Sequence, residues 1–227
     1  MTPPTVEGPI RTRMSGSLKL AIPRGALWEE TLDALDAVSV DTGELRSDSR
    51  SLVFSADGLT LVTMRPSDIP IYVEAGAADL GITGKDVLLE QEDRVTYEIL
   101  DLGYGACRMV LAGRKDDESL GESERRLGAM RIATKYPRIA ERFFDETGRQ
   151  AEVIEVKGSV ELAPLVGLAD GIVDLVATGR TLEENGLEVR EEIADSTARL
   201  VANRVSHKLR AEDVDDLVER LRKATAK

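Results

Sequence analysis

The sequence of 227 residues contains a single cysteine, Cys107, and a single histidine, His207. One cysteine excludes a disulfide within the chain, and one Cys with one His cannot form a metal site of Cys and His ligands. No run of apolar residues approaches the roughly 20 residues that a membrane-spanning helix requires. Disulfide-stabilised folds, Cys/His zinc sites and helical membrane spans are therefore not expected.

Aromatic residues and positive charge are also scarce. Phe, Trp and Tyr make up 4% of the sequence, so the core must consist mainly of Leu, Val, Ile and Ala. The formal net charge is −12 at pH 7, whereas general binding of nucleic acid requires a basic face. A net negative charge also repels anionic ligands, so Arg and Lys must be concentrated wherever such a ligand binds.

The first 17 residues are polar and lack the apolar segment of a signal peptide. We expect residues 1–17 to form a disordered tail and the protein to be cytoplasmic. After the tail, short apolar strands alternate with amphipathic helices, which is the pattern of an α/β protein with largely parallel sheets. Strands are expected at 18–22, 52–54, 59–64, 80–82, 95–100, 107–112, 131–133, 152–155, 175–177, 189–193 and 199–202. The strands at 52–54 and 59–64 are expected to form a hairpin across residues 56–58, Ala-Asp-Gly, because Asp-Gly is a strong turn signal. Helices are expected at 27–38, 137–146 and from 211, and shorter ones after 67, 158 and 181.

Residues 174–182 combine a short apolar strand, a Gly-containing turn and a helix start. Thr181 and Glu184 have the spacing of a capping box, and the helix is expected to end at residues 185–186, Asn-Gly. The first amides of a helix have no partners within it and lie at the positive end of its dipole. Such a turn either binds phosphate or is an ordinary strand-to-helix connection.

Several side chains of this segment favour the phosphate-binding interpretation. Gly179 permits close approach of a ligand, and Thr178, Arg180 and Thr181 add hydrogen-bond donors. Asp174 is expected to open the strand, close enough to accept a hydrogen bond from a ribose hydroxyl. The segment therefore predicts a site for a sugar phosphate.

Residues 79–87 repeat the order Asp, apolar strand, Thr-Gly, cation and helix. We therefore expect two half-molecules that present two such turns to one cleft. A Walker loop does not explain this copy, because its Gly would stand at Asp79 and its Ser or Thr at Asp86. Residues 103–105, Gly-Tyr-Gly, lack the third Gly of a dinucleotide fingerprint and are interpreted as a hinge or crossing point.

Five blocks of the sequence resemble the ATP phosphoribosyltransferase family: residues 23–27, 65–74, 79–87, 131–136 and 158–181. The last block is the most specific, because it combines Glu161, Asp174 and the Thr-Gly-Arg-Thr turn at the family's spacing. The resemblance covers the chain after its tail and is to the short form of the family. Short forms lack the C-terminal domain that binds histidine in long forms, and they depend on a separate regulatory subunit similar to a histidyl-tRNA synthetase.

This resemblance implies a fold, a reaction and partners. The fold would be two α/β lobes like a type II periplasmic binding protein, with lobe I at 18–104 plus 187–227 and lobe II at 105–186. The active site would lie in the cleft between them. In the implied reaction, which depends on Mg²⁺, N1 of ATP displaces pyrophosphate from 5-phosphoribosyl diphosphate (PRPP), the first step of histidine biosynthesis. A homodimer and a hetero-oligomer with the regulatory subunit are expected, without nucleic acid or membrane.

The resemblance also assigns residues to the site. Glu161 and Asp174 would position the ribose hydroxyls of PRPP and favour oxocarbenium-like charge. The rest of the PRPP site would comprise Ala177, Thr178, Gly179, Arg180 and Thr181, and the ATP site Arg24, Gly25, Arg50, Arg65 and Lys85. No side chain is assigned to Mg²⁺, which would bind mainly through the diphosphate and water. Where the family often has Pro-Lys-Gly-Arg, this chain has Ala26 in place of the second cation. Either Arg50 or Arg65 supplies the lost charge, or nucleotide affinity differs.

A ligand-binding module is the competing class, because the same two-lobed architecture serves binding proteins and effector domains. A secreted binding protein would need an export signal, and an effector domain usually follows a helix-turn-helix. The sequence shows neither. The reaction itself requires no nucleophilic side chain, since positioning and charge stabilisation suffice. The two phosphate-type turns therefore favour the enzyme.

Overall fold

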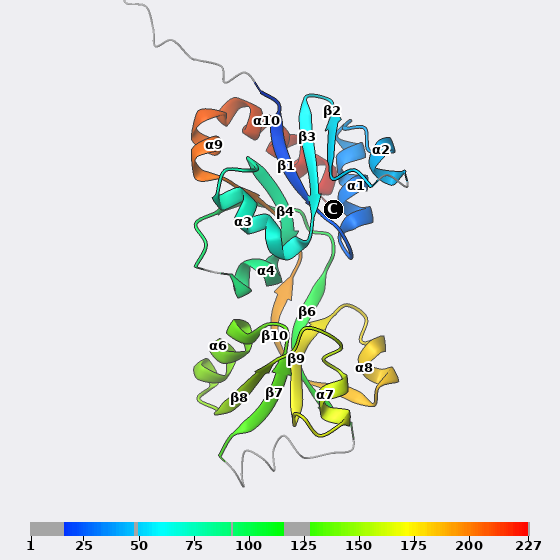
Figure 1. Ribbon diagram of the computed structural model, residues 1–227, viewed down its shortest axis with the longest axis vertical. Helices are drawn as coiled ribbons and strands as arrows, with labels where there is room; N and C mark the ends of the chain where they lie inside the picture. Colours follow the sequence, from blue (N-terminus) through cyan, green and yellow to red (C-terminus); the bar gives the residue numbers. More distant parts are fainter. Residues whose placement is uncertain (1–15, 48–49, 92, 116–127, 227) are drawn as a thin grey trace, which may run out of the picture.

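The computed structural model describes residues 16–47, 50–91, 93–115 and 128–226. Of the predicted tail, only Gly16 and Ser17 fall within this part, so the rest of that prediction lies outside the described residues. The chain forms two α/β lobes along its long axis, each built on its own sheet (Figure 1). The predicted two-lobed α/β architecture is therefore confirmed.

Lobe I contains a six-stranded sheet in the order β2-β3-β1-β4-β11-β5. Its strands are β1 (Leu18–Pro23), β2 (Val53–Ala56), β3 (Leu59–Met64), β4 (Leu80–Gly84), β5 (Tyr97–Asp101) and β11 (Ala198–Ala202). The three middle strands β3, β1 and β4 are parallel, whereas β2, β11 and β5 run antiparallel to the strands beside them. Asp57 and Gly58 join β2 to β3 with φ values of 48° and 81°, which confirms the Asp-Gly hairpin predicted from the sequence.

Helices cover both faces of the lobe I sheet, because alternate residues of each strand point to opposite sides. In β1, Leu20 and Ile22 pack with helices α1 and α10, whereas Ala21 packs with α3. The helices of this lobe are α1 (Trp28–Ala37), α2 (Gly43–Arg46), η1 (Pro66–Asp68), α3 (Ile69–Glu74), α4 (Lys85–Glu90), α9 (Arg204–Leu209) and α10 (Ala211–Thr225). In the described part of the chain, no helix has both the length and the apolar character needed to span a bilayer.

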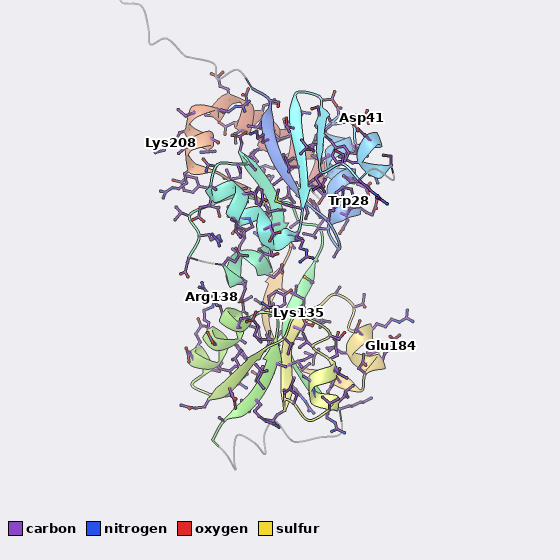
Figure 2. The ribbon with its side chains drawn as sticks, viewed as in Figure 1. Trp28, Asp41, Lys135, Arg138, Glu184 and Lys208 are labelled. Carbon is purple, nitrogen blue, oxygen red and sulfur yellow. The ribbon has the colours of Figure 1, made fainter. Side chains whose placement is uncertain are left out.

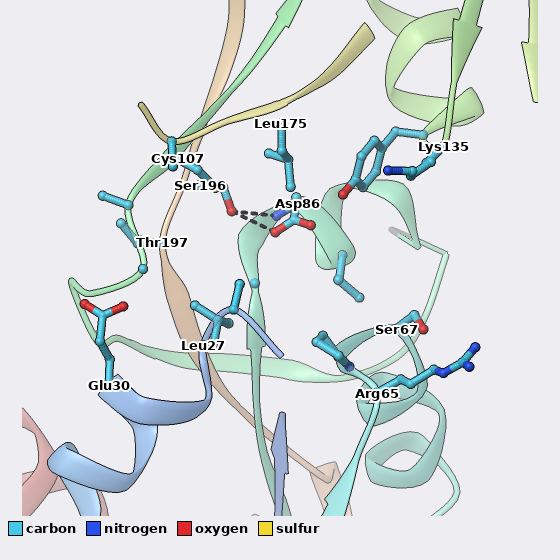
Figure 3. A pocket seen from close by; sticks show the side chains of 18 of the residues that line it. Leu27, Glu30, Arg65, Ser67, Asp86, Cys107, Lys135, Leu175, Ser196 and Thr197 are labelled. Atoms are coloured by element: carbon cyan, nitrogen blue, oxygen red, sulfur yellow. Dashed lines mark hydrogen bonds between the residues drawn. The ribbon is translucent and has the colours of Figure 1, made fainter. Parts of the chain in front are cut away.

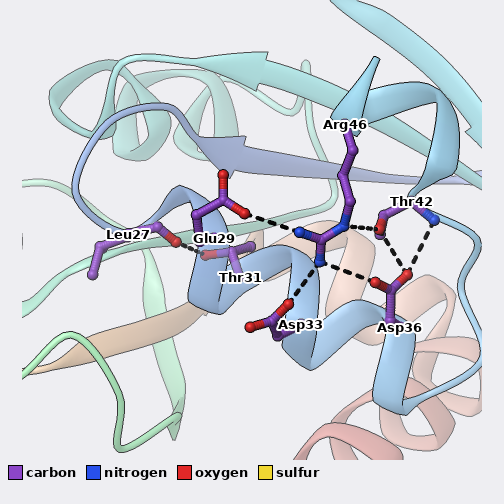
Figure 4. Close-up of polar contacts among 7 residues, drawn as sticks. All are labelled: Leu27, Glu29, Thr31, Asp33, Asp36, Thr42 and Arg46. Carbon is purple, nitrogen blue, oxygen red and sulfur yellow. Dashed lines mark hydrogen bonds and ion pairs between the residues drawn. The ribbon is translucent and has the colours of Figure 1, made fainter.

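Arg46, at the end of α2, holds that short helix against the acidic side of α1 (Figure 4). Its guanidinium donates to Glu29 at 2.9 Å, to Asp33 at 2.7 Å and to Asp36 at 3.0 Å. The Thr42 hydroxyl also donates to Asp36, and this bond is the main reason why the pKa of Asp36 is lowered. Exposed ion pairs individually contribute little to the free energy of unfolding. The main effect of this network is therefore to fix the position of α2 against α1.

Lobe II contains a five-stranded sheet in the order β10-β6-β9-β7-β8. Its strands are β6 (Cys107–Arg114), β7 (Met130–Thr134), β8 (Ala151–Glu155), β9 (Gly171–Val176) and β10 (Leu187–Ser196), and its helices are α6 (Pro137–Thr147), α7 (Leu162–Leu165) and α8 (Arg180–Glu184). Helix α6 packs on one face through Ile139, Ala140 and Phe144. Val160 and Leu182 pack on the other face, so both faces of this sheet are covered as well.

The chain crosses between the lobes twice, at residues 102–106 and at Thr197. The predicted return to lobe I at residue 187 is wrong, because β10 pairs with β6 of lobe II from Leu187 to Ser196. The apolar pattern identified a strand there, but it does not specify which sheet the strand joins. Since β6 leaves lobe I and β10 leads back to it, the two strands are antiparallel, and each sheet is mixed rather than largely parallel.

Helix α4 of lobe I contacts lobe II directly. The Glu90 carboxylate accepts hydrogen bonds from the backbone N–H groups of Arg138 and Ile139, both at 3.1 Å, in the first turn of α6. No side chain of the N-cap residue Tyr136 caps that helix, so Glu90 supplies the cap from the other lobe. Burial raises the pKa of Glu90 even though these two bonds oppose the rise. Leu89 beside it packs against the core of lobe II.

Gly81 is the position where β4 and α3 approach most closely. A Cβ atom there would lie 2.4 Å from Ile69 Cγ2 and 2.9 Å from Val73 Cγ2, both in the β-branched, buried side chains of α3. We expect Gly81→Ala to lower the free energy of unfolding by about 1–3 kcal/mol, the usual cost of overpacking a core. Urea unfolding followed by circular dichroism measures this loss.

The matched control is Gly158→Ala, because a Cβ at that exposed position meets no atom within 4 Å. Its free energy of unfolding should stay within about 0.5 kcal/mol of the wild-type value. Equal stability of the two variants would contradict the close approach of α3 to β4.

Candidate active site

A cavity of about 800 Å³ lies between the lobes and is lined by both of them (Figure 3). Both crossing segments also reach it, at residues 105–107 and 196–197. The other lining residues are Ala26, Leu27, Glu30, Arg65, Pro66, Ser67, Gly84, Asp86, Val87, Lys135, Tyr136, Val156, Lys157, Leu175 and Ala177. Seven of these residues have apolar side chains, three are cationic, and Glu30 and Asp86 are acidic. Such a cavity suits a ligand with a flat apolar part and an anionic part.

Asp86, in the first turn of α4, is a buried carboxylate within this cavity (Figure 3). Its Oδ1 accepts a hydrogen bond from Ser196 Oγ at 2.9 Å, and Ser196 Oγ accepts one from the Asp86 backbone N–H at 3.0 Å. These bonds join lobe I to the last residue of β10. Burial raises the pKa of Asp86, although the Ser196 hydroxyl opposes the rise. The carboxyl group is thus desolvated at the junction of the lobes.

Three cations border the cavity: Arg65 from lobe I, and Lys135 and Lys157 from lobe II. Lys135 lies where the two lobes meet (Figure 2). Tyr136 beside it is half-buried, and its pKa is raised first by burial and then by the charges of Asp86 and Asp174. The Tyr136 phenol therefore remains protonated, near carboxylates of both lobes.

A second cavity of about 130 Å³ adjoins the first within lobe II. It is lined by Glu161, by Asp174 at the C-terminal half of β9, and by Leu175, Val176, Ala177, Thr178, Gly179, Thr181 and Leu182. Leu175 and Ala177 line both cavities. The predicted sugar-phosphate segment therefore forms a compartment of its own that adjoins the interlobe cavity.

The turn at the start of α8 differs in detail from the sequence prediction. Gly179 is the N-cap residue with φ 83°, a left-handed conformation that glycine adopts without steric cost. The predicted capping box between Thr181 and Glu184 is wrong: the helix begins at Arg180, and Glu184 instead pairs with the Arg180 guanidinium at 2.7 Å. The Thr178 hydroxyl accepts a long hydrogen bond of 3.5 Å from the Arg180 N–H. Because the backbone reverses at Gly179, the turn amides border the small cavity without a side-chain cap.

Asp174 lies within β9 rather than at its start, which corrects the sequence prediction. Its Oδ1 accepts the Leu175 N–H at 2.9 Å, and its Oδ2 lies 3.9 Å from Lys135 Nζ. Burial raises the pKa of Asp174, Lys135 opposes the rise, and the nearby charge of Glu161 adds to it. The two carboxylates and the lysine thus form a cluster at the boundary between the two cavities.

The residues assigned to ATP are not all brought together. Arg65 lines the interlobe cavity, and Gly25 is the residue before its lining residue Ala26. Arg24 donates to Thr63 Oγ1 at 3.0 Å, and its guanidinium lies 5.2 Å from the centre of the Trp28 ring. Arg50 is exposed and is not among the residues that line the cavity.

Lys85 is not among the residues that line the cavity and pairs with Glu98 of β5 at 2.6 Å. The analogy between the two Thr-Gly turns holds only in part, because Gly84 has an extended φ of −76° whereas Gly179 is left-handed. Asp79 is also structural: its carboxylate accepts the Lys19 N–H and the Ser206 hydroxyl. Sequence reasoning missed Asp86, Lys135 and Tyr136, although all three lie inside the blocks at 79–87 and 131–136.

Comparison with known proteins agrees with this geometry. The profile of the ATP phosphoribosyltransferase family matches residues 65–223. The ATP phosphoribosyltransferase of Rubrobacter xylanophilus is 54% identical over 204 residues, which cover 88% of this chain and 93% of that protein. The ATP phosphoribosyl transferase (HisG:HisZ) complex from Thermotoga maritima gives a TM-score of 0.76 at 37% identity, over 92% of this chain and 98% of that chain. The periplasmic aliphatic sulphonate binding protein SsuA from Escherichia coli gives a TM-score of 0.60 at 12% identity, over 93% and 73% of the chains, and so shares the fold.

The raised pKa of Asp174 has a consequence for stability. The pKa of Asp174 is higher in the folded state than in the unfolded state. Its contribution to stability is therefore fully present at pH values below the unfolded-state pKa. This contribution is lost as pH rises through the folded-state pKa. We therefore expect Asp174→Asn to be more stable than the wild type at pH 7 to 8. The difference should shrink as pH falls through the raised pKa of Asp174 toward the ordinary range of an aspartate, because Asp174 itself becomes protonated. Thermal unfolding across this pH range measures the effect.

Asp170→Asn, just before β9, is the matched control. The Asp170 carboxylate accepts the Arg131 N–H at 2.8 Å and pairs with the Arg131 guanidinium at 2.9 Å, so its loss should lower the unfolding temperature at pH 7. A fall in the unfolding temperature of Asp174→Asn at pH 7 as well would contradict the view that Asp174 is held in the site at a cost to stability.

Proposed function

Because this chain belongs to the ATP phosphoribosyltransferase family, we propose that its two adjoining cavities hold the two substrates of that reaction, PRPP and ATP. The enzyme transfers the 5-phosphoribosyl group from PRPP to N1 of ATP and releases pyrophosphate, the first step of histidine biosynthesis. The observation that supports the placement is the wall of Leu175 and Ala177 that the two cavities share. Two ligands on either side of that wall would meet at its edge.

PRPP is assigned to the small cavity of lobe II. Its 5-phosphate binds the turn from Ala177 to Thr181, where Gly179 exposes the backbone and the threonine hydroxyls add donors. Arg180 contributes its backbone N–H rather than its guanidinium, because that group pairs with Glu184 and is largely exposed. The ribose then lies beside Glu161 and Asp174, with its C1 toward the interlobe cavity.

The carboxylates of Glu161 and Asp174 accept hydrogen bonds from the ribose hydroxyls and stabilise positive charge on the ring. As the bond from C1 to the diphosphate breaks, the ribose gains oxocarbenium character, and a desolvated carboxylate stabilises such charge more strongly than one in water. Lys135, 3.9 Å from Asp174, is positioned to attract the departing pyrophosphate. No covalent intermediate with the protein is required, since N1 of ATP is itself the nucleophile.

ATP is assigned to the interlobe cavity, whose apolar walls accommodate the adenine ring. Arg65 lines this cavity and can attract the triphosphate. Gly25 precedes the lining residue Ala26, whereas Arg24 and Arg50 belong to the same lobe but do not line the cavity. Lys85 is not part of the proposed site, because it pairs with Glu98. Of the two candidates for replacing the cation missing at Ala26, the lining of the cavity supports Arg65.

Mg²⁺ is the proposed cofactor. Among the described residues, no group of three or more acidic, His or Cys side chains could enclose a metal ion. Glu161 and Asp174 nevertheless supply two carboxylates in one cavity, which fits an ion that is held mainly by substrate phosphates and water. When bound, Mg²⁺ would neutralise charge on the diphosphate leaving group.

The proposed partners are a second copy of the chain and a regulatory subunit. The support for the second partner is the Thermotoga maritima structure, which is a complex of two components and aligns with 92% of this chain. Histidine control would then depend on the regulatory subunit rather than on this chain. The predicted cytoplasmic location is part of the same proposal, since the two substrates are cytoplasmic metabolites.

We expect Asp174→Ala to lower kcat/KM for PRPP by about 100-fold or more, the usual effect of removing a group that stabilises transition-state charge. Thr178→Ala should lower it by about 10-fold, because one hydrogen bond to a charged phosphate is lost. The measurement is the absorbance of phosphoribosyl-ATP in a mixture with ATP, PRPP, Mg²⁺ and pyrophosphatase. Retained activity in both variants would contradict the assigned PRPP site.

Lys85→Ala is the matched control for these variants, because it removes a cation near the other Thr-Gly turn. Its kcat/KM for both substrates should stay within about twofold of the wild-type value, since Lys85 pairs with Glu98 outside the cavity. A large loss in this variant alone would return Lys85 to the ATP site.

We expect histidine at millimolar concentration to leave the turnover of the isolated chain unchanged, because control is assigned to a separate subunit. Addition of a purified histidyl-tRNA-synthetase-like regulatory subunit should make turnover sensitive to histidine and shift the chain to a larger complex on size-exclusion chromatography. Strong inhibition of the chain alone by histidine would contradict this assignment.

A further inference from the structure

Asp86 is a buried carboxylate of the interlobe cavity that the proposed reaction does not yet use. Its side chain is buried, with 9% of the residue exposed; Oδ1 accepts the Ser196 hydroxyl, and the Tyr136 hydroxyl also hydrogen-bonds to the carboxylate. Among the described residues, no Lys or Arg forms an ion pair with it. A desolvated carboxylate without a cation is unfavourable, and it also repels the phosphates that the cavity must admit. A bound ligand that offers Asp86 a donor or a positive charge would offset this cost.

The structure makes room for this carboxylate. A Cβ atom on Gly84 would lie 2.1 Å from Asp86 Oδ1, so glycine at that position leaves the space that the carboxylate occupies. Gly84 has an extended φ of −76°, which any residue can adopt, so the lack of a side chain there serves space rather than backbone conformation. The carboxylate therefore has a preformed place beside the apolar wall of Val87 and Leu175.

The proposed substrates contain one group that fits both the apolar wall and the carboxylate. Phosphates are anionic, and the ribose of PRPP is assigned to Glu161 and Asp174 in the other cavity. The adenine ring has apolar faces, and its 6-amino group donates hydrogen bonds next to the reacting atom N1. We propose that Asp86 accepts a hydrogen bond from the 6-amino group of ATP and stabilises the positive charge that the ring gains during transfer. This inference rests on the proposed function.

The chemistry of the step gives the carboxylate its role. The lone pair of N1 forms the bond to C1 of the ribose, and the electron pair of the breaking C1–O bond leaves with pyrophosphate. The purine ring then carries one positive charge, which is shared by N1, C6 and the 6-amino nitrogen. A carboxylate at the 6-amino group is attracted more strongly after this charge appears than before, so it favours the transition state. Asp86 takes up no proton in the step.

The neighbours of Asp86 indicate how this residue lies relative to the proposed ribose site. The Tyr136 hydroxyl hydrogen-bonds to Asp86 and also feels the charge of Asp174, so it lies near both the carboxylate assigned to adenine and the one assigned to ribose. Leu175, which separates the two cavities, is drawn beside Asp86 in Figure 3. We therefore place the adenine ring with its N1 toward the ribose across this boundary and its adjacent 6-amino group toward Asp86.

The test compares ATP with purine riboside triphosphate, which has hydrogen in place of the 6-amino group, through the release of pyrophosphate. The preference for ATP is the ratio of the two kcat/KM values, and the intrinsic difference between the two rings cancels when this ratio is compared between enzymes. We expect Asp86→Ala to reduce the preference by about 10- to 100-fold relative to the wild type, as for loss of a hydrogen bond to a charged group. The KM for PRPP should change little, and Asp86→Asn, which keeps an acceptor oxygen, should fall between the two.

Ser196→Ala is the matched control, because it removes the hydroxyl that binds Asp86 but leaves the carboxylate. It should retain the wild-type preference even if its total activity falls. An unchanged preference in Asp86→Ala would overturn the inference and make Asp86 a purely structural link between the lobes. A crystal structure of the wild type with ATP gives an independent answer if Asp86→Ala does not fold: the 6-amino nitrogen should lie within about 3.2 Å of Asp86, and any other position would overturn the inference. Failure of the wild type to turn over ATP with PRPP in the presence of the regulatory subunit would instead refute the proposed function.

Discussion

The antiparallel pairing of β6 with β10 is the interaction on which the rest of the molecule depends. Cys107 begins one strand and Ser196 ends the other, and these two residues are register partners at the edge of the interlobe cavity. The ladder fixes both crossing segments to lobe II, and the hydrogen bonds between Ser196 and Asp86 then join them to lobe I. The cavity is therefore assembled at the junction, from segments that are more than 80 residues apart in the chain.

The protein has a net negative charge, yet its proposed substrates are anions, so the distribution of its charged side chains matters. The net charge of −12 is distributed so that many arginines are bound by acids of the framework, as Arg46 and Arg131 are, whereas Arg65, Lys135 and Lys157 border the cavity. The desolvated carboxylate of Asp174 lies 3.9 Å from Lys135, and that of Asp86 lines the same cavity as these cations. The raised pKa values of these two carboxylates show that the site is not optimised for stability, which is typical of residues placed for chemistry.

The sequence predicted the strands and helices well because their apolar residues recur with clear periods, and the Asp-Gly hairpin because its turn requires positive φ. It did not predict that β10 joins the sheet of lobe II, since pairing partners are set by tertiary contacts rather than by local pattern. In the candidate site, the PRPP segment forms a compartment as one continuous stretch. Lys85 was selected in place of Asp86 because a cation near a Thr-Gly turn suggests phosphate. Successive helical residues, however, point about 100° apart, and in this helix Asp86 lines the cavity whereas Lys85 pairs with Glu98.

The cap that Glu90 of lobe I supplies to α6 of lobe II bears on how the cleft can open. Separation of the two lobes on this side would leave two backbone N–H groups of α6 without their acceptor and would expose Leu89 to water at the same time. If the lobes separate on the opposite side of the cleft, the hydrogen bonds of Glu90 and the packing of Leu89 are kept. Substrate entry is thus expected to follow a rotation of one lobe relative to the other. The axis of this rotation should lie close to the α4–α6 contact, so that the cleft opens on the opposite side.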